Sequence, residues 1–517
     1  MALFRSERGI GRGEMAESQL EVPFFAVFIL VAGVSLLAQH LYYANFPVTV
    51  ALAVSMVFFG ATVMRVEVGV YLLIIAMLLS PEIGVGNTLS GENELNLRYD
   101  DVLIIVVFFG VMVKLAFEGR FSLWQPSPIN LGIFCYYSVC LFSSALAYER
   151  ALGAWDKRTA LFVLLKMMEF YLIFILVGQS IRSHKDLRTA LFFFFAVSLI
   201  VNTYAIYTIG ATPRVGAPFE RDGTEPNTLG GYLVICMCVA LGLFTQAKTM
   251  RHRMLFLALI AFSFVPFLYT LSRASYVALL VGVTVISVAS RQIWIIAVCV
   301  LAVVVLTFVI PVMPVSVVER VQFTFQDEGV EVSAFGQETG IRVDKSTHER
   351  VQIWSKVEFI LFRVGIEFFL FGGGVSWESV LDSQYARVIL ETGMVGLAAF
   401  IFLQLTLVYT IRQAYRWTED WVARGVALGM FATTIALMVH SFGTISFLIV
   451  RIMEPFWFLA ALCAMIRNEA LARYFLRLQA QRLQVARAKA AGEETPQDSG
   501  VPAPAQPAVA SRGTARA

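Results

Sequence analysis

Charged residues are scarce in this chain of 517 residues. It is 58% hydrophobic and only 15% charged, with a formal net charge of +3. So small a charged share excludes a soluble globular protein and indicates a protein that crosses a membrane several times. The chain has no run of interleaved basic and aromatic residues, so a nucleic-acid partner is not expected.

The few cysteines form no pattern that indicates a cross-link or a metal. All of them lie within apolar runs, at Cys135, Cys140, Cys236, Cys238, Cys299 and Cys463. Neither a disulfide framework nor a zinc site is therefore expected. A convincing small-residue cleavage site after the first apolar run is also lacking, so we interpret that run as a retained anchor and not as a signal peptide.

Apolar runs of membrane-spanning length are what the sequence does contain. At roughly 17–25 residues per crossing they predict about fourteen helices, or twelve to thirteen if the two shortest do not cross. The expected fold class is an all-α polytopic membrane protein. The runs lie near residues 22–40, 46–64, 67–80, 101–118, 129–147, 160–178, 189–209, 228–244, 254–270, 275–290, 292–311, 386–410, 424–441 and 447–466.

Lys and Arg are more frequent in the short loops on one side of these spans than on the other. This asymmetry predicts that both termini are cytoplasmic. Arginines on the opposite side break the trend and are therefore candidates for binding an anion. The expected segments are a cytoplasmic N-terminus, the first eleven helices, a long external loop, the last three helices, a basic amphipathic cytoplasmic helix and a disordered tail, at 1–20, 21–311, 312–385, 386–466, 467–490 and 491–517.

The external loop is expected to contain a helix over about residues 348–370. Apolar residues recur there at spacings of three and four, namely Val351, Trp354, Val357, Leu361 and Val364. This pattern predicts an amphipathic helix at the membrane surface. Two interpretations stay open, a helix that caps a cavity below it and a merely structural interfacial helix.

The most informative stretch is residues 371–397. A glycine-rich turn, Gly372–Gly374, precedes the polar run Asp382-Ser383-Gln384, and a helix entering the membrane follows. Irregular polar backbone in a membrane protein must be buried in protein or face water. The sequence therefore predicts that aqueous chemistry occurs at this stretch.

Four motifs together resemble the O-antigen ligase/polymerase superfamily, the Wzy- and WaaL-type integral membrane glycosyltransferases. The motifs are Pro226-Asn227-Thr228-Leu229-Gly230-Gly231-Tyr232, Leu271-Ser272-Arg273-Ala274, Arg350-x-x-x-Trp354 and the stretch from Asp382 to Gly396. The resemblance covers about residues 200–410. Ligases carry His-[Asn/Ser/Gln]-x9-Gly-x-x-Gly at the last position, where this chain matches Ser383, Gly393 and Gly396 but has Asp382 in place of the histidine. That substitution favours the polymerase branch.

The resemblance implies a GT-C-like fold and a glycosyltransferase. A polymerase would transfer a growing glycan from undecaprenyl pyrophosphate to a lipid-linked repeat unit on the external face of a bacterial cytoplasmic membrane. The implied partners are that undecaprenyl-pyrophosphate-linked oligosaccharide, membrane lipids, and the flippase and chain-length or export proteins of a polysaccharide pathway. No cofactor or metal is expected. The alternatives are an O-antigen ligase and, from a different class, a transporter or flippase.

This chemistry assigns roles to specific residues. A leaving pyrophosphate needs fixed cations, and the planar fork of arginine binds two oxygens at once. We expect Arg273 to be the leading catalytic cation, with Asp382 as the base for the attacking hydroxyl and Glu391 as a second catalytic carboxylate. The expected ligands of pyrophosphate or glycan are Arg214, Arg221, Arg350, Arg387 and Ser383.

Each assignment has a competing interpretation. Arg273 would otherwise only reach lipid headgroups, and Arg214 and Arg221 would pair with neighbouring acids. Asp382 would otherwise be a helix N-cap. Elsewhere, the sequence predicts a buried Arg451–Glu454 pair, an intramembrane Lys166–Glu169 pair, and helix-capping roles for Asp100 and Asp101.

Overall fold

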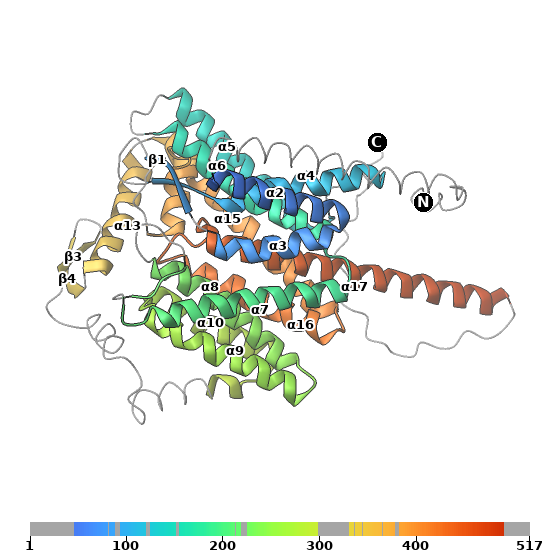
Figure 1. Ribbon diagram of the computed structural model, residues 1–517. Coiled ribbons are helices and arrows are strands. Elements are labelled where there is room, and N and C mark those ends of the chain that lie inside the picture. Colours follow the sequence, from blue (N-terminus) through green and yellow to red (C-terminus); the bar gives the residue numbers. More distant parts are fainter. Residues whose placement is uncertain are drawn as a thin grey trace, which may run out of the picture. The chain divides into compact units, whose positions relative to one another are not determined.

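The computed structural model describes most of the chain between Phe46 and Ala490 (Figure 1). The described residues are 46–80, 82–87, 94–119, 125–150, 155–211, 214–218, 225–297, 330–334, 337–343, 345–363, 365–377 and 382–490. The predicted first span, most of the predicted span 292–311, the loop residue Arg221 and both terminal segments lie outside them.

Helices dominate the described residues. They are α2 (Phe46–Met64), α3 (Val66–Leu79), α4 (Tyr99–Phe117), α5 (Pro128–Glu149), α6 (Lys157–Ser180), α7 (His184–Tyr207), α8 (Pro226–Gln246), α9 (Met250–Tyr269), α10 (Arg273–Ser290), α13 (Lys345–Arg363), α14 (Ile366–Phe371), α15 (Gln384–Trp417), α16 (Trp421–His440) and α17 (Val450–Ala490). Two antiparallel hairpins, which the sequence did not predict, pair β1 (Glu82–Asn87) with β2 (Glu94–Arg98) and β3 (Val330–Ala334) with β4 (Gln337–Val343).

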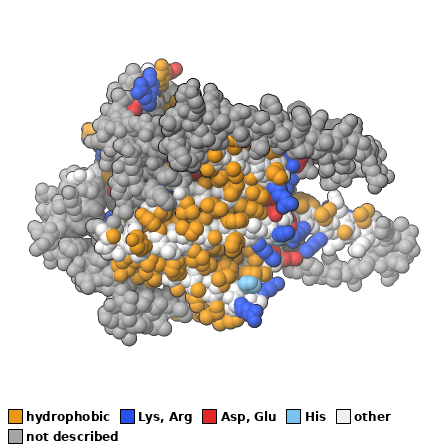
Figure 2. All heavy atoms as spheres, viewed as in Figure 1, with side chains coloured by type: hydrophobic (Ala, Val, Ile, Leu, Met, Phe, Trp, Pro, Cys, Tyr) orange, Lys and Arg blue, Asp and Glu red, His pale blue; other side chains and the backbone are white. Residues whose placement is uncertain are grey.

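Eight of the described helices are long and apolar enough to cross a membrane, namely α5, α6, α7, α8, α9, α10, α15 and α16. Their outer surfaces stay hydrophobic. Phe134 and Phe192, for example, are 70% and 68% exposed. Figure 2 shows a broad hydrophobic surface with charged side chains gathered in a band at one end of it. Water would oppose so much apolar exposure, whereas lipid tails favour it. The protein is therefore a polytopic helical membrane protein.

Helix α8 lies at the centre of the packing, and it is the most buried of the eight. It packs against α16 through small residues. A Cβ added at Gly425 would lie 2.8 Å from Leu243 Cα, and one at Gly429 would lie 2.5 Å from Val239 Cα. Glycine at these positions lets the two backbones approach closely, as small residues commonly do between membrane helices.

Hydrogen bonds between side chains and backbone show which helix ends lie together. Ser272 before α10 bonds Asn227 of α8 at 2.7 Å, and the Gln384 N–H at the start of α15 donates to the Ser441 carbonyl after α16 at 3.0 Å. We call the end at which α8, α10 and α15 begin and α16 finishes the turn end, after the Gly372–Gly374 turn. The opposite end, at which α3 and α7 begin, is called the cavity end.

Three segments differ in extent or continuity from their approximate predictions. The expected helix over 348–370 is two helices, α13 and α14, with Gly365 at φ 128° preceding α14, a backbone conformation that favours glycine. The span expected from 386 begins at Gln384 and continues to Trp417. The last predicted span and the basic segment 467–490 both fall within the residues of α17, and the chain divides into two units, Met1–Asn468 and Glu469–Ala517.

Candidate functional site

The glycine-rich turn is bonded to an interruption in α15. Gly393 has φ 67° and ψ −166°, so the helix is unwound there, and a Cβ at this residue would collide with the backbone of Leu370. The unwinding leaves carbonyls without their usual helical donors. The turn supplies these donors: the Gly373 N–H bonds the Leu390 carbonyl at 2.9 Å, and the Gly374 N–H bonds that of Glu391 at 2.9 Å.

The end of α5 holds the same turn from its other side. Ser143 Oγ lies 2.6 Å from the carbonyls of both Phe371 and Glu391. Ser144 Oγ accepts from the Val375 N–H at 3.3 Å, and the Trp155 indole donates to the Val375 carbonyl at 2.9 Å. The irregular backbone around the turn is thus hydrogen-bonded to groups of the protein itself.

Two predicted site residues, Arg387 and Glu391, bind each other inside this assembly. Arg387 Nε donates to Glu391 Oε1 at 2.8 Å, and both side chains are buried. The same Oε1 accepts from the Ser376 N–H at 2.8 Å. Glu391 therefore connects the start of α15 to the glycine-rich turn through Oε1, which accepts both bonds. This geometry favours a positioning role for both residues.

We expect Glu391→Ala to lower the free energy of unfolding by about 3–5 kcal/mol, because it leaves the Arg387 guanidinium buried without its carboxylate. The measurement is denaturant or thermal unfolding of the purified protein in detergent. The double variant Arg387→Met, Glu391→Leu, which removes both charges, should recover most of the loss.

A matched control is the exposed ion pair of Arg150 with Glu367, joined at 2.9 Å, in which Glu367 is 77% exposed. Because solvent screens exposed pairs, Glu367→Ala should cost less than about 1 kcal/mol. Equal losses for Glu391→Ala and Glu367→Ala would show that the Arg387–Glu391 pair does not hold the turn.

Arg273, the predicted catalytic cation, is the first residue of α10 and is half-buried. The turn before it is held by Arg214, whose Nε and Nη2 donate to the carbonyls of Thr270 and Leu271 at 3.1 and 3.2 Å. Leu271 has φ 51°, an uncommon conformation for a residue with a side chain. Arg214 therefore fixes a strained turn that leads directly into Arg273.

A chain of hydrogen bonds connects this turn to a buried histidine, His440. The chain runs from Asn227 Oδ1 to Ser272 Oγ at 2.7 Å and from Ser272 Oγ to Ser275 Oγ at 2.8 Å. It continues from Ser275 Oγ to His440 Nε2 at 2.9 Å and from His440 Nδ1 to Ser446 Oγ at 2.8 Å. If Ser446 donates to His440 Nδ1, then His440 Nε2–H donates to Ser275, Ser275 donates to Ser272, and Ser272 donates to Asn227 Oδ1.

His440 is not among the site residues that the sequence predicted. The structure places it under the start of α10, where it supports Ser272, the N-cap that accepts from the Ser275 N–H at 3.3 Å. The one sequence signal was a histidine at the end of a spanning apolar run, a position at which a polar side chain is costly unless it is bonded.

Asp382 and Ser383 lie at the same end of the bundle. Asp382 is exposed, and the N-cap of α15 is Ser383, which forms no side-chain capping bond. The competing interpretation of Asp382 as the N-cap was therefore wrong. Ser383 is buried, and its Oγ has no hydrogen-bond partner among the described residues. Arg350 lies on α13, but its side chain lies outside the described part of the chain, as does all of Arg221.

A second group of charges is buried among the start of α4, the middle of α6 and the first turns of α17. The predicted Lys166–Glu169 pair is present at 3.3 Å, and Lys166 also contacts Asp101. Asp101 accepts from the Arg98 N–H at 2.9 Å, which confirms its predicted capping role. The predicted intramembrane pair is thus not isolated, because Lys166 also connects it to Asp101 of α4.

Arg98 joins this network to α17. Its guanidinium contacts Asp100 at 2.9 Å and Glu454 at 3.6 Å. Burial would lower the pKa of Arg98, but the neighbouring carboxylates, led by Asp100, outweigh it and hold that pKa above its ordinary value. Arg451 Nη1 donates to the Leu78 carbonyl of α3 at 3.3 Å. Each member of the predicted Arg451–Glu454 pair therefore contacts a residue outside α17, because Glu454 contacts Arg98 of β2.

Carboxylate oxygens of Asp100, Asp101 and Glu454 lie within 4.8 Å of one another, the one such group among the described residues that is close enough to hold a metal ion. Arg98 and Lys166 already contact these carboxylates. The group is therefore better described as a structural charge network than as a metal centre.

The chain matches no protein-family model and no curated protein. The resemblance described above therefore depends on the sequence motifs alone. The structure shows the positions of these motifs relative to one another. The motifs that begin at Pro226, Leu271 and Asp382 are far apart in sequence but meet at the turn end.

Proposed function

We propose that the protein is a polysaccharide polymerase that transfers a growing glycan from undecaprenyl pyrophosphate to a lipid-linked repeat unit. We further propose that it has about fourteen spans in a GT-C-like arrangement, with the turn end on the external face of a bacterial cytoplasmic membrane. The observation that carries the proposal is the adjacency of the α8 and α10 N-termini, joined by Ser272 and Asn227 at 2.7 Å, with Arg273 as the first residue of α10.

Helix N-termini present free N–H groups and a partial positive charge, and they favour phosphate. Two of them side by side, with an arginine at one, suit the two phosphates of a pyrophosphate leaving group. Arg214 and the His440 chain hold this turn in place from below. Because the lipid pyrophosphate is already activated, transfer requires only charge stabilisation and a base.

In this proposal the acceptor hydroxyl approaches from the α15 side. Asp382 is exposed directly before the start of α15, and Gln384 ties that start to the end of α16 through the Ser441 carbonyl at 3.0 Å. Since His440 immediately precedes Ser441, the proposed base and the proposed cation are held by the same helix end. Arg387 and Glu391 connect the start of α15 to the glycine-rich turn, and we assign them no step of the reaction itself.

A ligase and a transporter remain the alternatives. A transporter would place its ionisable residues near the bilayer midplane. Here the charges of Lys166 and Glu169, within the apolar run of α6, are paired with each other, and the proposed ligands Arg214 and Arg273 lie at the turn end. This distribution favours transfer at a membrane surface over passage through the bilayer.

The proposal is tested with purified protein in detergent micelles, supplied with purified lipid-linked repeat units. A polymerase is expected to convert single units into a ladder of longer lipid-linked products. A ligase would need a separate acceptor and would leave single units unchanged. A flippase would also give no longer product, because micelles have no second leaflet. Absence of a ladder with correctly folded protein would therefore reject the polymerase.

A further inference from the structure

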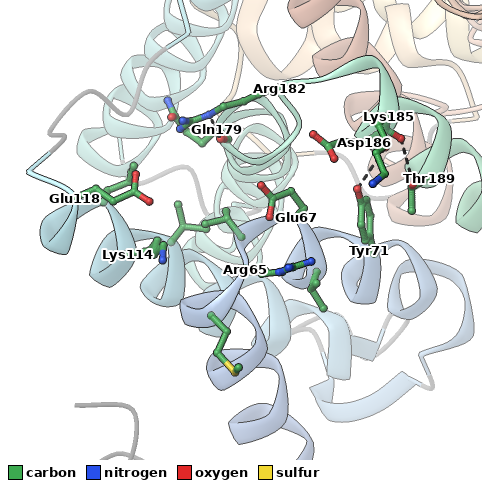
Figure 3. A pocket seen from close by; sticks show the side chains of 15 residues that line it. Arg65, Glu67, Tyr71, Lys114, Glu118, Gln179, Arg182, Lys185, Asp186 and Thr189 are labelled. Atoms are coloured by element: carbon green, nitrogen blue, oxygen red, sulfur yellow. Dashed lines mark hydrogen bonds between the residues drawn. The ribbon is translucent and has the colours of Figure 1, made fainter. Parts of the chain in front are cut away.

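A cavity of about 530 Å³ opens at the cavity end, away from the proposed site (Figure 3). It lies among the α2–α3 link, the last turns of α4, the α6–α7 link and the first turns of α7. None of the residues assigned to glycan transfer lines it. A ligand in this cavity would therefore bind apart from the residues proposed for glycan transfer.

Cations from four separate elements line this cavity: Arg65, Lys114, Arg182 and Lys185. Figure 3 shows them distributed around the cavity, with Glu67 among them. One of the acidic residues in the lining, Asp186, is committed elsewhere, because its Oδ2 accepts from Ser183 N and Oγ at 3.2 and 2.6 Å. With Glu67 and Glu118 the lining has three carboxylates against its four cations, so its formal charge is +1.

Two further features select the kind of anion. The N-cap of α3 is Arg65, which forms no side-chain capping bond, so this helix N-terminus faces the cavity uncapped. The remaining wall is largely apolar and includes Met64, Val111 and Leu115. A free inorganic anion would use only the charged part of such a lining, whereas a lipid uses both parts.

We propose that this cavity binds the phosphodiester headgroup of an anionic phospholipid, with the glycerol and upper acyl chains against the apolar wall. The cavity lies at the ends of membrane-spanning helices, which is the depth of the headgroups. Basic pockets between membrane helices commonly hold anionic lipid headgroups at this level. Arg65 and Lys114 supply the principal contacts, because they reach the cavity from adjacent elements beside the uncapped α3 terminus.

The probe is phosphatidylglycerol, titrated into the purified full chain and followed by native mass spectrometry and by the midpoint of thermal unfolding. The parent protein is expected to retain bound phosphatidylglycerol and to unfold at a higher temperature when it is added. The variant Arg65→Gln, Lys114→Gln should bind it at least tenfold more weakly. The matched control is Lys248→Gln, Arg251→Gln, which removes two exposed cations of the same end that do not line the cavity.

Phosphatidylcholine and inorganic phosphate serve as competitors. Neither should displace phosphatidylglycerol from the parent at equal concentration if the site needs both a net negative headgroup and the apolar wall. Equal loss of lipid in the control variant would overturn the proposal, as would equal stabilisation by phosphatidylcholine. Full stabilisation by inorganic phosphate would assign the cavity to a free anion and would also overturn it.

Discussion

Asp382→Asn is expected to stop glycan transfer while leaving the fold intact. If Asp382 accepts the proton of the attacking hydroxyl, its loss should slow conversion of lipid-linked repeat units by about 10²–10⁴-fold. The structure removes the main alternative explanation, because the N-cap of α15 is Ser383 and not Asp382. Asp382 is also exposed, so an amide of the same size should not disturb packing.

Two control variants separate catalysis from local structure. Ser383→Ala changes the N-cap itself, but that serine forms no side-chain capping bond, so stability should change little. Asp382→Glu keeps a carboxylate and should retain more activity than Asp382→Asn. An Asn variant that works within a few-fold of the parent would rule out the base assignment and leave a mechanism driven by the arginines.

Arg273→Ala and Arg273→Lys are both expected to lose about 10²–10³-fold in transfer rate, the range found when a fixed donor to a developing anion is removed. Lysine keeps the charge but cannot bind two oxygens in one plane, so it should fail nearly as badly as alanine. The measurement is the same detergent assay at equal protein, with binding of the lipid-linked donor followed separately.

Arg291 is the matched control because it lies at the other end of the same helix. Its φ of 58° is left-handed, so Arg291→Gly removes an arginine and relaxes the backbone at once. This variant should transfer glycan normally. Full activity in both Arg273 variants would show that the residue only contacts lipid headgroups or a protein neighbour.

Periodicity and local motifs were sufficient for several parts of this protein. Within the described residues, the apolar runs predicted helices, since a membrane requires continuous hydrogen-bonded backbone over a length set by the bilayer, and eight of these helices are long and apolar enough to cross one. Asp101 was predicted as a cap because its partner lies three residues away at Arg98. Lys166 and Glu169 were predicted to pair because they lie one helical turn apart.

Long-range partners could not be predicted in the same way. His440 contacts Ser275 across 165 residues of sequence, and nothing local to either residue indicates the other. Glu391 was expected to be a catalytic carboxylate because it lies near the membrane edge. Its bonds to Arg387 and to the Ser376 N–H instead indicate a positioning role, and the bond to Ser376 depends on how the glycine-rich turn folds back.

The amino-acid sequence by itself determined the class of the protein, because its apolar share and the length of its apolar runs leave a helical membrane protein as the stable outcome. It also determined which short segments carry polar groups in an otherwise apolar chain. Only the tertiary structure decided which of these segments meet. Unwinding α15 at Gly393 frees carbonyls for the glycine-rich turn, and a buried His440 requires partners from α10 and from Ser446. Both constraints come from hydrogen bonds that must be completed where water is excluded, so they depend on neighbours in space and not on neighbours in sequence.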